Sequence, residues 1–134
     1  MNCTFGHVCF FVADKVKMED YYCNKLGLKR MFEQSFPGTD FSAIYVRIAG
    51  GQFLELIGNM AHEEKGKTGF GHLCLHVQDI NTAHREVTEK GLNPTAVEMG
   101  SSNCLKFYLN DPEGNTLEIM QLLPDSLQSI HDHD

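Results

Sequence analysis

The sequence predicts an α+β fold in which two tandem βαβββ modules form one cup-shaped mixed sheet. The first observation is a repeat, because residues 5–14 read FGHVCFFVAD and residues 70–79 read FGHLCLHVQD, identical at six of ten positions. The second is a match between GQFLE at 51–55 and GNTLE at 114–118, which keeps the Gly, the Leu and the Glu. An offset close to half of the 134 residues indicates one duplication and not an array of short repeats.

The first strand and the helix of each module are predicted from periodicity and capping residues. Residues 4–13 and 70–78 are short runs rich in aromatic and branched side chains, which are typical of strands. A helix N-cap favours a side chain that accepts from the free N–H groups of the first turn, and a left-handed C-cap favours glycine. These signals place helices at 15–26 and 80–90, between Asp14 and Gly27 and between Asp79 and Gly91.

Three extended segments follow each helix and complete the βαβββ pattern. They are expected at 28–36, 42–49 and 52–58 in the first module and at 95–99, 104–110 and 115–122 in the second. The turn Asp111-Pro112-Glu113-Gly114 joins the last two as a hairpin, because Pro fixes φ and Gly accepts positive φ. We therefore expect a single domain, 1–134, with modules at 4–59 and 69–122 and a tail at 123–134.

Composition excludes several classes of protein. Hydrophobic residues make up 42% of the chain and charged residues 22%, which are values of a folded globular domain. The formal charge of -7 disfavours nucleic acid as a partner, because an acidic protein repels the phosphate backbone. Five cysteines without a C-x-x-C pair disfavour a disulfide framework, and no apolar run approaches the roughly 20 residues that cross a bilayer. The opening residues lack the basic region and cleavage site of a signal peptide, so we expect a reduced, cytoplasmic protein.

Strand alternation directs the histidines of the two first strands toward one face. Because successive side chains point to opposite faces, His7 shares a face with Cys9, and His72 shares a face with Cys74 and His76. The opposite face of both strands is wholly apolar, as expected of the side that helices cover. The histidines are therefore predicted to face the concavity of the sheet.

Two glutamates, Glu55 and Glu118, lie in the closing strands among apolar neighbours. A buried carboxylate is costly unless a cation compensates it. Two neutral imidazoles and two carboxylates neutralise a divalent cation and offer the nitrogen and oxygen ligands that suit zinc, nickel, cobalt, manganese or iron. A single strand histidine is more often a hydrogen-bonded core residue, but the same placement in both modules makes coincidence a poor explanation. The sequence thus predicts one metal site, formed by His7, Glu55, His72 and Glu118.

This pattern resembles the vicinal oxygen chelate superfamily, also described as the glyoxalase/bleomycin resistance/dioxygenase fold. The resemblance covers residues 5–122 and is carried by the paired GH(V/L)C strand openings and by the DPEGNTLE hairpin that delivers Glu118. It implies that the two modules form a half-barrel holding a metal ion with open coordination positions. The ligand set His, Glu, His, Glu resembles that of bacterial glyoxalase I, whereas methylmalonyl-CoA epimerase has Gln where this chain has Glu55.

By that resemblance the protein would be a metal-dependent lyase of the lactoylglutathione lyase type. The reaction would convert a hemithioacetal of methylglyoxal and a thiol into a 2-hydroxyacyl thioester, with nickel, cobalt or zinc favoured over manganese or iron. Glu118 is the first choice for the base that moves the carbon-bound proton and Glu55 for its partner, although their near symmetry leaves the order open. Epimerisation, ring-cleaving dioxygenation or thiol transfer on the same metal are alternatives, as is a non-catalytic drug-binding resistance protein.

Substrate contacts are predicted from the same resemblance. Asn59 matches a position where glutathione-dependent members resemble each other in carrying Asn, but the Arg that they carry four residues after the first ligand is here Phe11. A different thiol or substrate would tolerate this departure, and Arg47 or Lys106 would supply a clamp for a carboxylate. His76 is expected to form a hydrogen bond behind the ligands.

Other polar residues receive a structural interpretation. Cys9 and Cys74 are expected to pack as small apolar fillers beside the site. Ser101 and Ser102 belong to a loop that would close over substrate. The histidines of SIHDHD are expected in the solvated tail.

The resemblance also implies an assembly. In small glyoxalase-like chains it implies a two-fold homodimer in which His7 and Glu55 come from one subunit and His72 and Glu118 from the other. We therefore expect a homodimer with sites shared between subunits and a small-molecule substrate, without a membrane or nucleic-acid partner.

Overall fold

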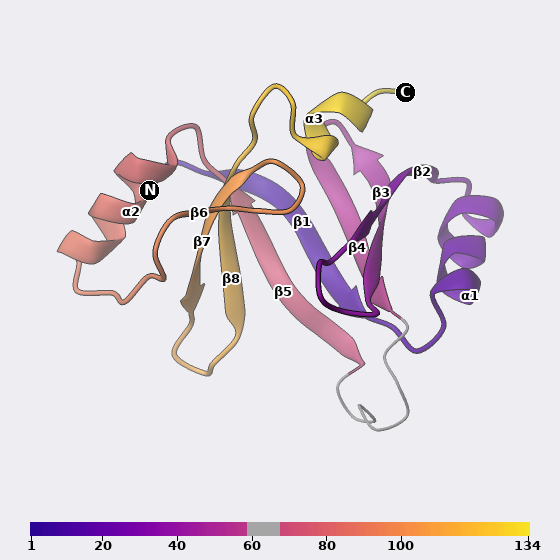
Figure 1. Cartoon of the computed structure of the whole chain (residues 1–134), viewed down its shortest axis with the longest axis horizontal. Coiled ribbons are helices and arrows are strands. Elements are labelled where there is room, and N and C mark those ends of the chain that lie inside the picture. Colours follow the sequence, from indigo (N-terminus) through magenta and orange to yellow (C-terminus); the bar gives the residue numbers. More distant parts are fainter. Residues whose placement is uncertain (59–67) are drawn as a thin grey trace.

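The computed structural model describes residues 1–58 and 68–134 and contains one eight-stranded mixed sheet (Figure 1). The strand order is β2-β3-β4-β1-β5-β8-β7-β6, so each module contributes four adjacent strands. The strands are β1 (Thr4–Phe11), β2 (Lys29–Ser35), β3 (Ser42–Ala49), β4 (Gln52–Gly58), β5 (Gly69–His76), β6 (Glu98–Met99), β7 (Leu105–Asn110) and β8 (Thr116–Gln121). The predicted α+β fold is confirmed.

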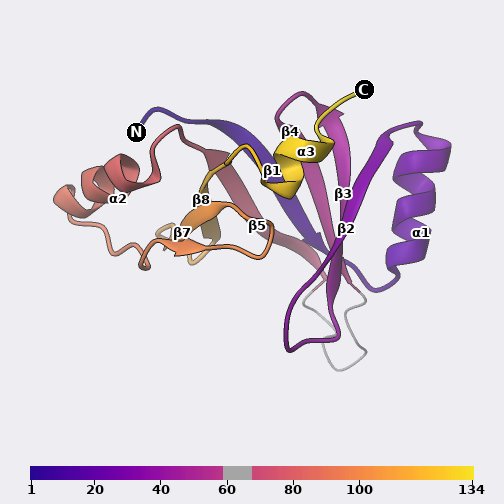
Figure 2. The same ribbon diagram turned by 45° about the horizontal axis from the view of Figure 1, so that its top comes forward.

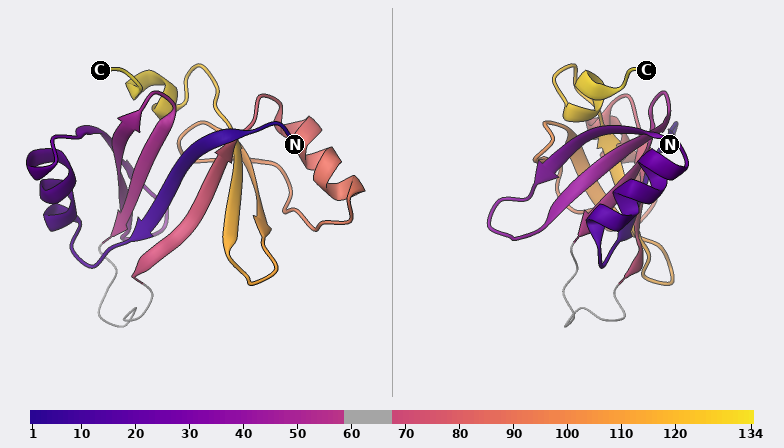
Figure 3. Two further views of the ribbon diagram at one scale, coloured as in Figure 1. Left: turned by 180° about the vertical axis from the view of Figure 1, so that it is seen from behind. Right: turned by 90° about the vertical axis from the view of Figure 1, so that its right-hand side faces the viewer.

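The two modules meet at an antiparallel pair formed by their first strands, β1 and β5. In this pair His7 lies opposite Cys74, and Cys9 lies opposite His72. β1 also pairs in parallel with β4, and β5 pairs in parallel with β8, so the strands that carry the two glutamates flank the central pair. Seen from behind, β1 and β5 run side by side along the middle of the curved sheet (Figure 3).

Helices lie at opposite ends of the molecule (Figure 1). α1 (Lys15–Glu19) continues into a π-helical segment, η1 (Asp20–Lys25), and α2 (Ile80–Glu89) is an α-helix throughout. Asp14 and Asp79 accept hydrogen bonds from backbone N–H groups of the first turns, which confirms both predicted N-caps. In the described part of the chain, no helix has the length and apolar character needed to cross a membrane.

Each of these helices packs on the core of its own module. Under α2 the buried residues are Val77, Ile80, Ala83, Val87, Phe107 and Ile119. Under α1 and η1 they are Val12, Ile44, Val46, Leu54 and Leu56. Full burial of such a side chain stabilises the fold by roughly 1.5–3 kcal/mol. Because both cores occupy the helix-covered faces, the concave face remains available for polar side chains.

The C-terminal segment is folded onto the sheet, so the prediction of a frayed, solvated tail for SIHDHD is wrong. α3 (Leu127–His131) forms here, and Ser126 and Gln128 are completely buried. The backbone N–H of Leu127 donates to the carbonyl of Ser102, and the Gln128 side chain donates to the hydroxyl of the same serine. Figure 2 shows α3 between the strands of the two modules. The segment thus connects the loop before β7 to the first module.

Candidate metal centre

The four predicted ligands meet on the concave face at the centre of the sheet. Their Nε2 and Oε1 atoms face one another. The Nε2 atoms of His7, on β1, and His72, on β5, are 2.9 Å apart. Oε1 of Glu55, on β4, lies 3.4 Å from Nε2 of His7 and 3.3 Å from Nε2 of His72. Oε1 of Glu118, on β8, lies 3.3 and 3.4 Å from the same two nitrogen atoms.

One chain supplies all four side chains, which corrects the expectation that two subunits share each site. The reason is that β1 and β5 are hydrogen-bonded neighbours, so the half-sites of the two modules face each other within one sheet. His7 is completely buried, and Glu55 and Glu118 are 4% and 5% exposed. A homodimer stays a prediction, but completion of the set of four does not require a second subunit.

The arrangement fits a divalent metal ion. An ion bound tetrahedrally with bonds of about 2.0–2.2 Å requires donor atoms roughly 3.3–3.6 Å apart. The four nitrogen–oxygen separations, 3.3 to 3.4 Å, meet this requirement, and the nitrogen–nitrogen separation is shorter. Oε1 of Glu55 is buried and has no hydrogen-bond partner among the described residues, a situation that a bound cation relieves.

The charges in this site depend on one another. Burial lowers the pKa of His72, but the adjacent Cys9, Glu118 and Glu55 outweigh burial and raise it to about 12. Burial raises the pKa of Glu55, but the two neighbouring histidines outweigh it and lower the pKa to about 2. In the absence of a metal ion, the site therefore holds imidazolium and carboxylate groups, and metal binding displaces protons from the imidazoles.

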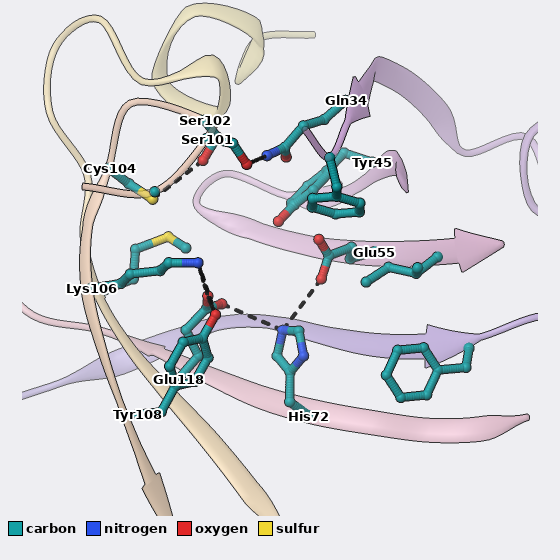
Figure 4. Close-up of a pocket in the computed structure, with 15 residues that line it drawn as sticks. Gln34, Tyr45, Glu55, His72, Ser101, Ser102, Cys104, Lys106, Tyr108 and Glu118 are labelled. Carbon is teal, nitrogen blue, oxygen red and sulfur yellow. Dashed lines mark hydrogen bonds and ion pairs between the residues drawn. The ribbon is translucent and has the colours of Figure 1, made fainter. Parts of the chain in front are cut away.

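A cavity of about 220 Å³ opens onto the site (Figure 4). Glu55, His72 and Glu118 form part of its wall, and both modules contribute the rest. Its other lining residues include the apolar Phe11, Phe36, Ile57 and Met120 and the polar Gln34, Ser101, Lys106 and Tyr108. The amide of Gln34 on β2 donates to the hydroxyl of Ser101, which closes the wall across the two modules.

A chain of hydrogen bonds holds Glu118 against the cavity wall. The Tyr108 hydroxyl donates to Oε2 of Glu118 at 3.0 Å, and Nζ of Lys106 donates to the Tyr108 hydroxyl at 2.8 Å (Figure 4). Tyr45 lies opposite Glu55 in the strand register, as Tyr108 lies opposite Glu118. Burial and then the charge of Glu55 raise the pKa of Tyr45, so this tyrosine and its glutamate also interact. Within the described residues, the lysine that extends the chain of hydrogen bonds lies on the Glu118 side.

The predicted substrate contacts do not all reach the cavity. Phe11 and Lys106 line it. Arg47 does not, because its guanidinium pairs with Asp132 and Asp134 of the C-terminal segment, at 2.9 and 2.8 Å. This corrects the expectation that Arg47 clamps a carboxylate. The prediction for Asn59 falls on a residue that lies outside the described part of the chain.

Polar residues of the cavity wall that sequence reasoning missed include Tyr108 and Gln34. Strand alternation carried a signal for the first, because Tyr108 shares its face of β7 with Lys106 and lies opposite Glu118. No local pattern distinguishes Gln34, whose position depends on how β2 approaches the loop that contains Ser101.

Fold and site together define the class of protein. The family model described as the Glyoxalase/Bleomycin resistance protein/Dioxygenase superfamily matches residues 4–119, and the chain belongs to this superfamily. Its sequence is 25% identical to a probable lactoylglutathione lyase of Synechocystis, over 86% of this chain and 92% of the relative. It is 24% identical to the lactoylglutathione lyase of Pseudomonas aeruginosa, over 87% of this chain and 81% of the relative.

Solved structures support the same fold. The methylmalonyl-CoA epimerase of Mycobacterium tuberculosis superposes with a TM-score of 0.78 at 18% identity, covering 90% of this chain and 88% of the epimerase. A hypothetical protein from Bacillus halodurans has a TM-score of 0.78 at 19% identity and covers 92% of this chain and 96% of its own. At these identities the likeness concerns the fold.

Proposed function

We propose that this protein is a metal-dependent isomerase of the glyoxalase I type. Its substrate would be the hemithioacetal that a 2-oxoaldehyde such as methylglyoxal forms with a thiol, and its product a 2-hydroxyacyl thioester. The observation that carries the proposal is the convergence of two imidazoles and two carboxylates, with nitrogen–oxygen separations of 3.3 to 3.4 Å, beside a cavity. The lactoylglutathione lyases among the relatives support the reaction class.

The metal ion would be held by His7, Glu55, His72 and Glu118. Imidazole and carboxylate ligands favour zinc, nickel or cobalt. They do not discriminate among these three ions, so the availability of each metal decides which one is bound. When bound, the ion supplies Lewis-acid stabilisation of the negative charge that develops on the two neighbouring substrate oxygen atoms.

A carboxylate of the site would move the proton from one substrate carbon to the next. Glu118 is held through Oε2 by Tyr108, which is itself held by Lys106, whereas the contacts of Oε1 of Glu55, at 3.3 to 3.4 Å, are with the two histidines. We therefore assign proton transfer to Glu55 and the role of a fixed ligand to Glu118, the reverse of the order expected from the sequence. Burial of both carboxylates favours retention of the transferred proton, because water has little access to them.

The cavity wall would orient the substrate. Lys106 and Tyr108 offer a cation and a phenol on the Glu118 side of the cavity, and Nζ of Lys106 lies 3.9 Å from Oε2 of Glu118. Phe11 and Ile57 offer apolar surface to the methyl group of a methylglyoxal adduct. Phe11 stands at the position where glutathione-dependent relatives resemble each other in carrying Arg. The cavity therefore accommodates a thiol other than glutathione at least as well as glutathione.

The decisive experiment follows thioester formation by ultraviolet absorbance. The full chain is stripped of metal and reloaded with nickel, cobalt or zinc, and methylglyoxal is supplied with glutathione or with other cellular thiols. We expect metal-dependent thioester formation that Glu55→Gln lowers by at least ~100-fold, because the proton acceptor is removed. Glu113→Gln, in the exposed turn before β8, is the matched control and is expected to retain activity.

Lack of thioester formation with every metal and thiol would contradict the proposal. Epimerisation is a second outcome to examine, because solved epimerases share the fold. Racemisation of methylmalonyl-CoA by the metal-loaded protein, without thioester formation, would replace the isomerase assignment by an epimerase.

A further inference from the structure

A second group of metal-binding side chains lies next to the first site. One ligand atom each of His7, Cys74 and His76 lies within 4.8 Å of the other two. Nε2 of His7 faces the four-residue site, and Nδ1 of the same ring is buried without a hydrogen-bond partner among the described residues. Nε2 of His76 is buried and lacks a partner in the same way. Two ring nitrogen atoms without hydrogen-bond partners, Nδ1 of His7 and Nε2 of His76, therefore lie near the thiol of Cys74.

The pairing of β1 with β5 brings these three side chains together. His7 lies opposite Cys74, and a register shift occurs in β1 between Phe5 and His7, at Gly6. The ring of His76 occupies the space above Gly6, since a Cβ atom on this glycine would lie 2.6 Å from Nε2 of His76. Cys74 is completely buried, and its sulfur is 3.9 Å from the carbonyl of Leu75, too far for a strong hydrogen bond.

We propose that His7, Cys74 and His76 form a second metal site, which binds a borderline transition-metal ion such as zinc or cobalt and shares His7 with the first site. Thiolate and imidazole are the ligands that these ions prefer, and water completes a tetrahedral set. Bonds of about 2.0 Å to nitrogen and about 2.3 Å to sulfur require donors roughly 3.3–3.7 Å apart, so the three side chains, whose ligand atoms lie within 4.8 Å of one another, would close on a bound ion. Binding releases the thiol proton of Cys74, and the Nδ1 proton of His7 when Nε2 already holds a metal ion, to solvent.

A separate cavity lies beside His76, one of the three residues of this second site. The cavity has a volume of about 570 Å³ and is lined by the N-terminal residues 1–4, by the start of α2 and by His76. Asp79 and Glu86 also line it, where Asp79 caps α2 and Glu86 pairs with the N-terminal ammonium at 3.6 Å. His76 does not belong to the wall of the cavity that opens onto Glu55 and Glu118. The second site therefore adjoins a different cavity from the first site.

The duplication provides an internal comparison. Cys9 is the counterpart of Cys74 and lies opposite His72, as Cys74 lies opposite His7. Phe11, however, stands where the second module has His76. A thiol and an imidazole are thus paired in both modules, and only the second module adds another imidazole. A thiolate-containing site is expected at Cys74 and not at Cys9.

Cobalt(II) alone is the probe that tests this proposal. A thiolate ligand adds a near-ultraviolet charge-transfer band that imidazole and carboxylate ligands lack. The reduced, metal-free full chain is titrated with cobalt(II) in the absence of oxygen. We expect the wild-type chain to bind a second equivalent of cobalt(II) and to show the thiolate band. Cys74→Ser and His76→Phe are expected to lose the band and the second equivalent, whereas the matched variant Cys9→Ser keeps both.

Two results overturn the proposal: a wild-type chain without the thiolate band at saturating cobalt(II), or a band that survives Cys74→Ser. The wild-type measurement decides the question even if a variant does not fold. Glu55→Gln is expected to weaken the first site and to leave the thiolate band in place. Failure of the proposed isomerase site and failure of this second site therefore give different spectra.

Discussion

Tyr45 and Tyr108 occupy equivalent positions in the two modules, but the surroundings of their hydroxyl groups differ, because Lys106 donates to that of Tyr108. Each tyrosine lies opposite a glutamate in the strand register, and Tyr108 donates to Glu118 at 3.0 Å. Lys106 in turn donates to Tyr108. The residues around an expected metal ligand therefore differ between the halves, although the ligands themselves are duplicated.

Tyr108→Phe is expected to weaken metal binding by roughly 10- to 100-fold, the usual effect of removing a hydrogen bond that orients a ligand. The physical reason is that Oε2 of Glu118 loses its donor and the carboxylate gains rotational freedom. Competition with a coloured chelator measures the change. Tyr45→Phe is the matched control, and equal losses of affinity in the two variants would show that the hydrogen bond to Glu118 has no special role.

Gly58, at the end of β4, is close to the backbone of the first module. A Cβ atom here would lie 2.8 Å from a methyl carbon of Val12 and 2.9 Å from its carbonyl oxygen. Gly58→Ala is therefore expected to lower the free energy of unfolding by about 1–3 kcal/mol, as overpacking does. Urea denaturation measures it. Gly50→Ala, where the nearest atom lies at 3.6 Å, is the control, and an unchanged midpoint for Gly58→Ala would contradict the steric argument.

For individual residues, the sequence predicted the positions of those that the duplication marks and did not predict the positions of the others. His7, Glu55, His72 and Glu118 meet because equivalent positions of the two modules face each other across β1 and β5. The partners of Arg47 come from the C-terminal segment, whose position depends on tertiary packing and has no local signal in the sequence.

Among the secondary-structure elements, α3 and its preceding turn have a larger role than their length suggests. The Ser126 hydroxyl accepts from the backbone N–H of Leu123 at 2.8 Å and donates to the carbonyl of Asn103. Asn103 has a positive φ of 61°, which few residues other than glycine adopt. The C-terminal segment thereby fixes the loop that carries Ser101 of the cavity wall.

Ser126→Ala is expected to reduce the free energy of unfolding by about 1–3 kcal/mol, because a buried N–H donor and a carbonyl lose their partner. Thermal unfolding followed by circular dichroism measures the loss. Ser129→Ala, on the same helix, is the control. A melting temperature that falls no further in Ser126→Ala than in Ser129→Ala would argue against a structural role of these hydrogen bonds.

The sequence predicted elements well where a cap or a strong alternation marks them. Asp14 and Asp79 identified the starts of both helices. The sequence did not indicate the change from α1 to the π-helical η1, because this change alters the hydrogen bonding without altering the apolar pattern. The expected strand at 95–99 is shortened to Glu98–Met99, because that segment reaches the sheet edge at those two residues alone within the described chain.

For the whole molecule, the buried site links stability to pH. The folded-state pKa of His72 is about 12 against 6.5 ordinarily, so its stabilising effect is present below pH 6.5 and is lost as the pH rises toward 12. The pKa of Glu55 is about 2 against 4.5, so its effect is present above pH 4.5 and is lost as the pH falls toward 2. The metal-free protein is thus expected to be most stable between pH 4.5 and 6.5.

A bound metal ion is expected to counteract the loss of stability that the metal-free protein shows as the pH rises. Metal binding requires neutral imidazoles, so the stabilisation by zinc grows over the range where the metal-free protein weakens. At a zinc concentration of 100 times Kd, the gain is about 2.7 kcal/mol. Melting temperatures with zinc and with chelator, recorded from roughly pH 4 to pH 9, measure both profiles. If the melting temperatures with zinc and with chelator changed with pH in parallel, the linkage between metal binding and proton release would be contradicted.

The antiparallel pairing of β1 and β5 relates the two modules by an approximate two-fold axis that passes near the four ligands. An environment with that symmetry would present the same groups to the two ends of a bound molecule and would not distinguish one end from the other. The direction in which a substrate binds must then be set where the copies have diverged. Lys106 replaces the counterpart of Ala43, and His76 replaces that of Phe11. Evolution of a site that binds its substrate in one orientation therefore needs few substitutions, provided that they occur on one side of the axis.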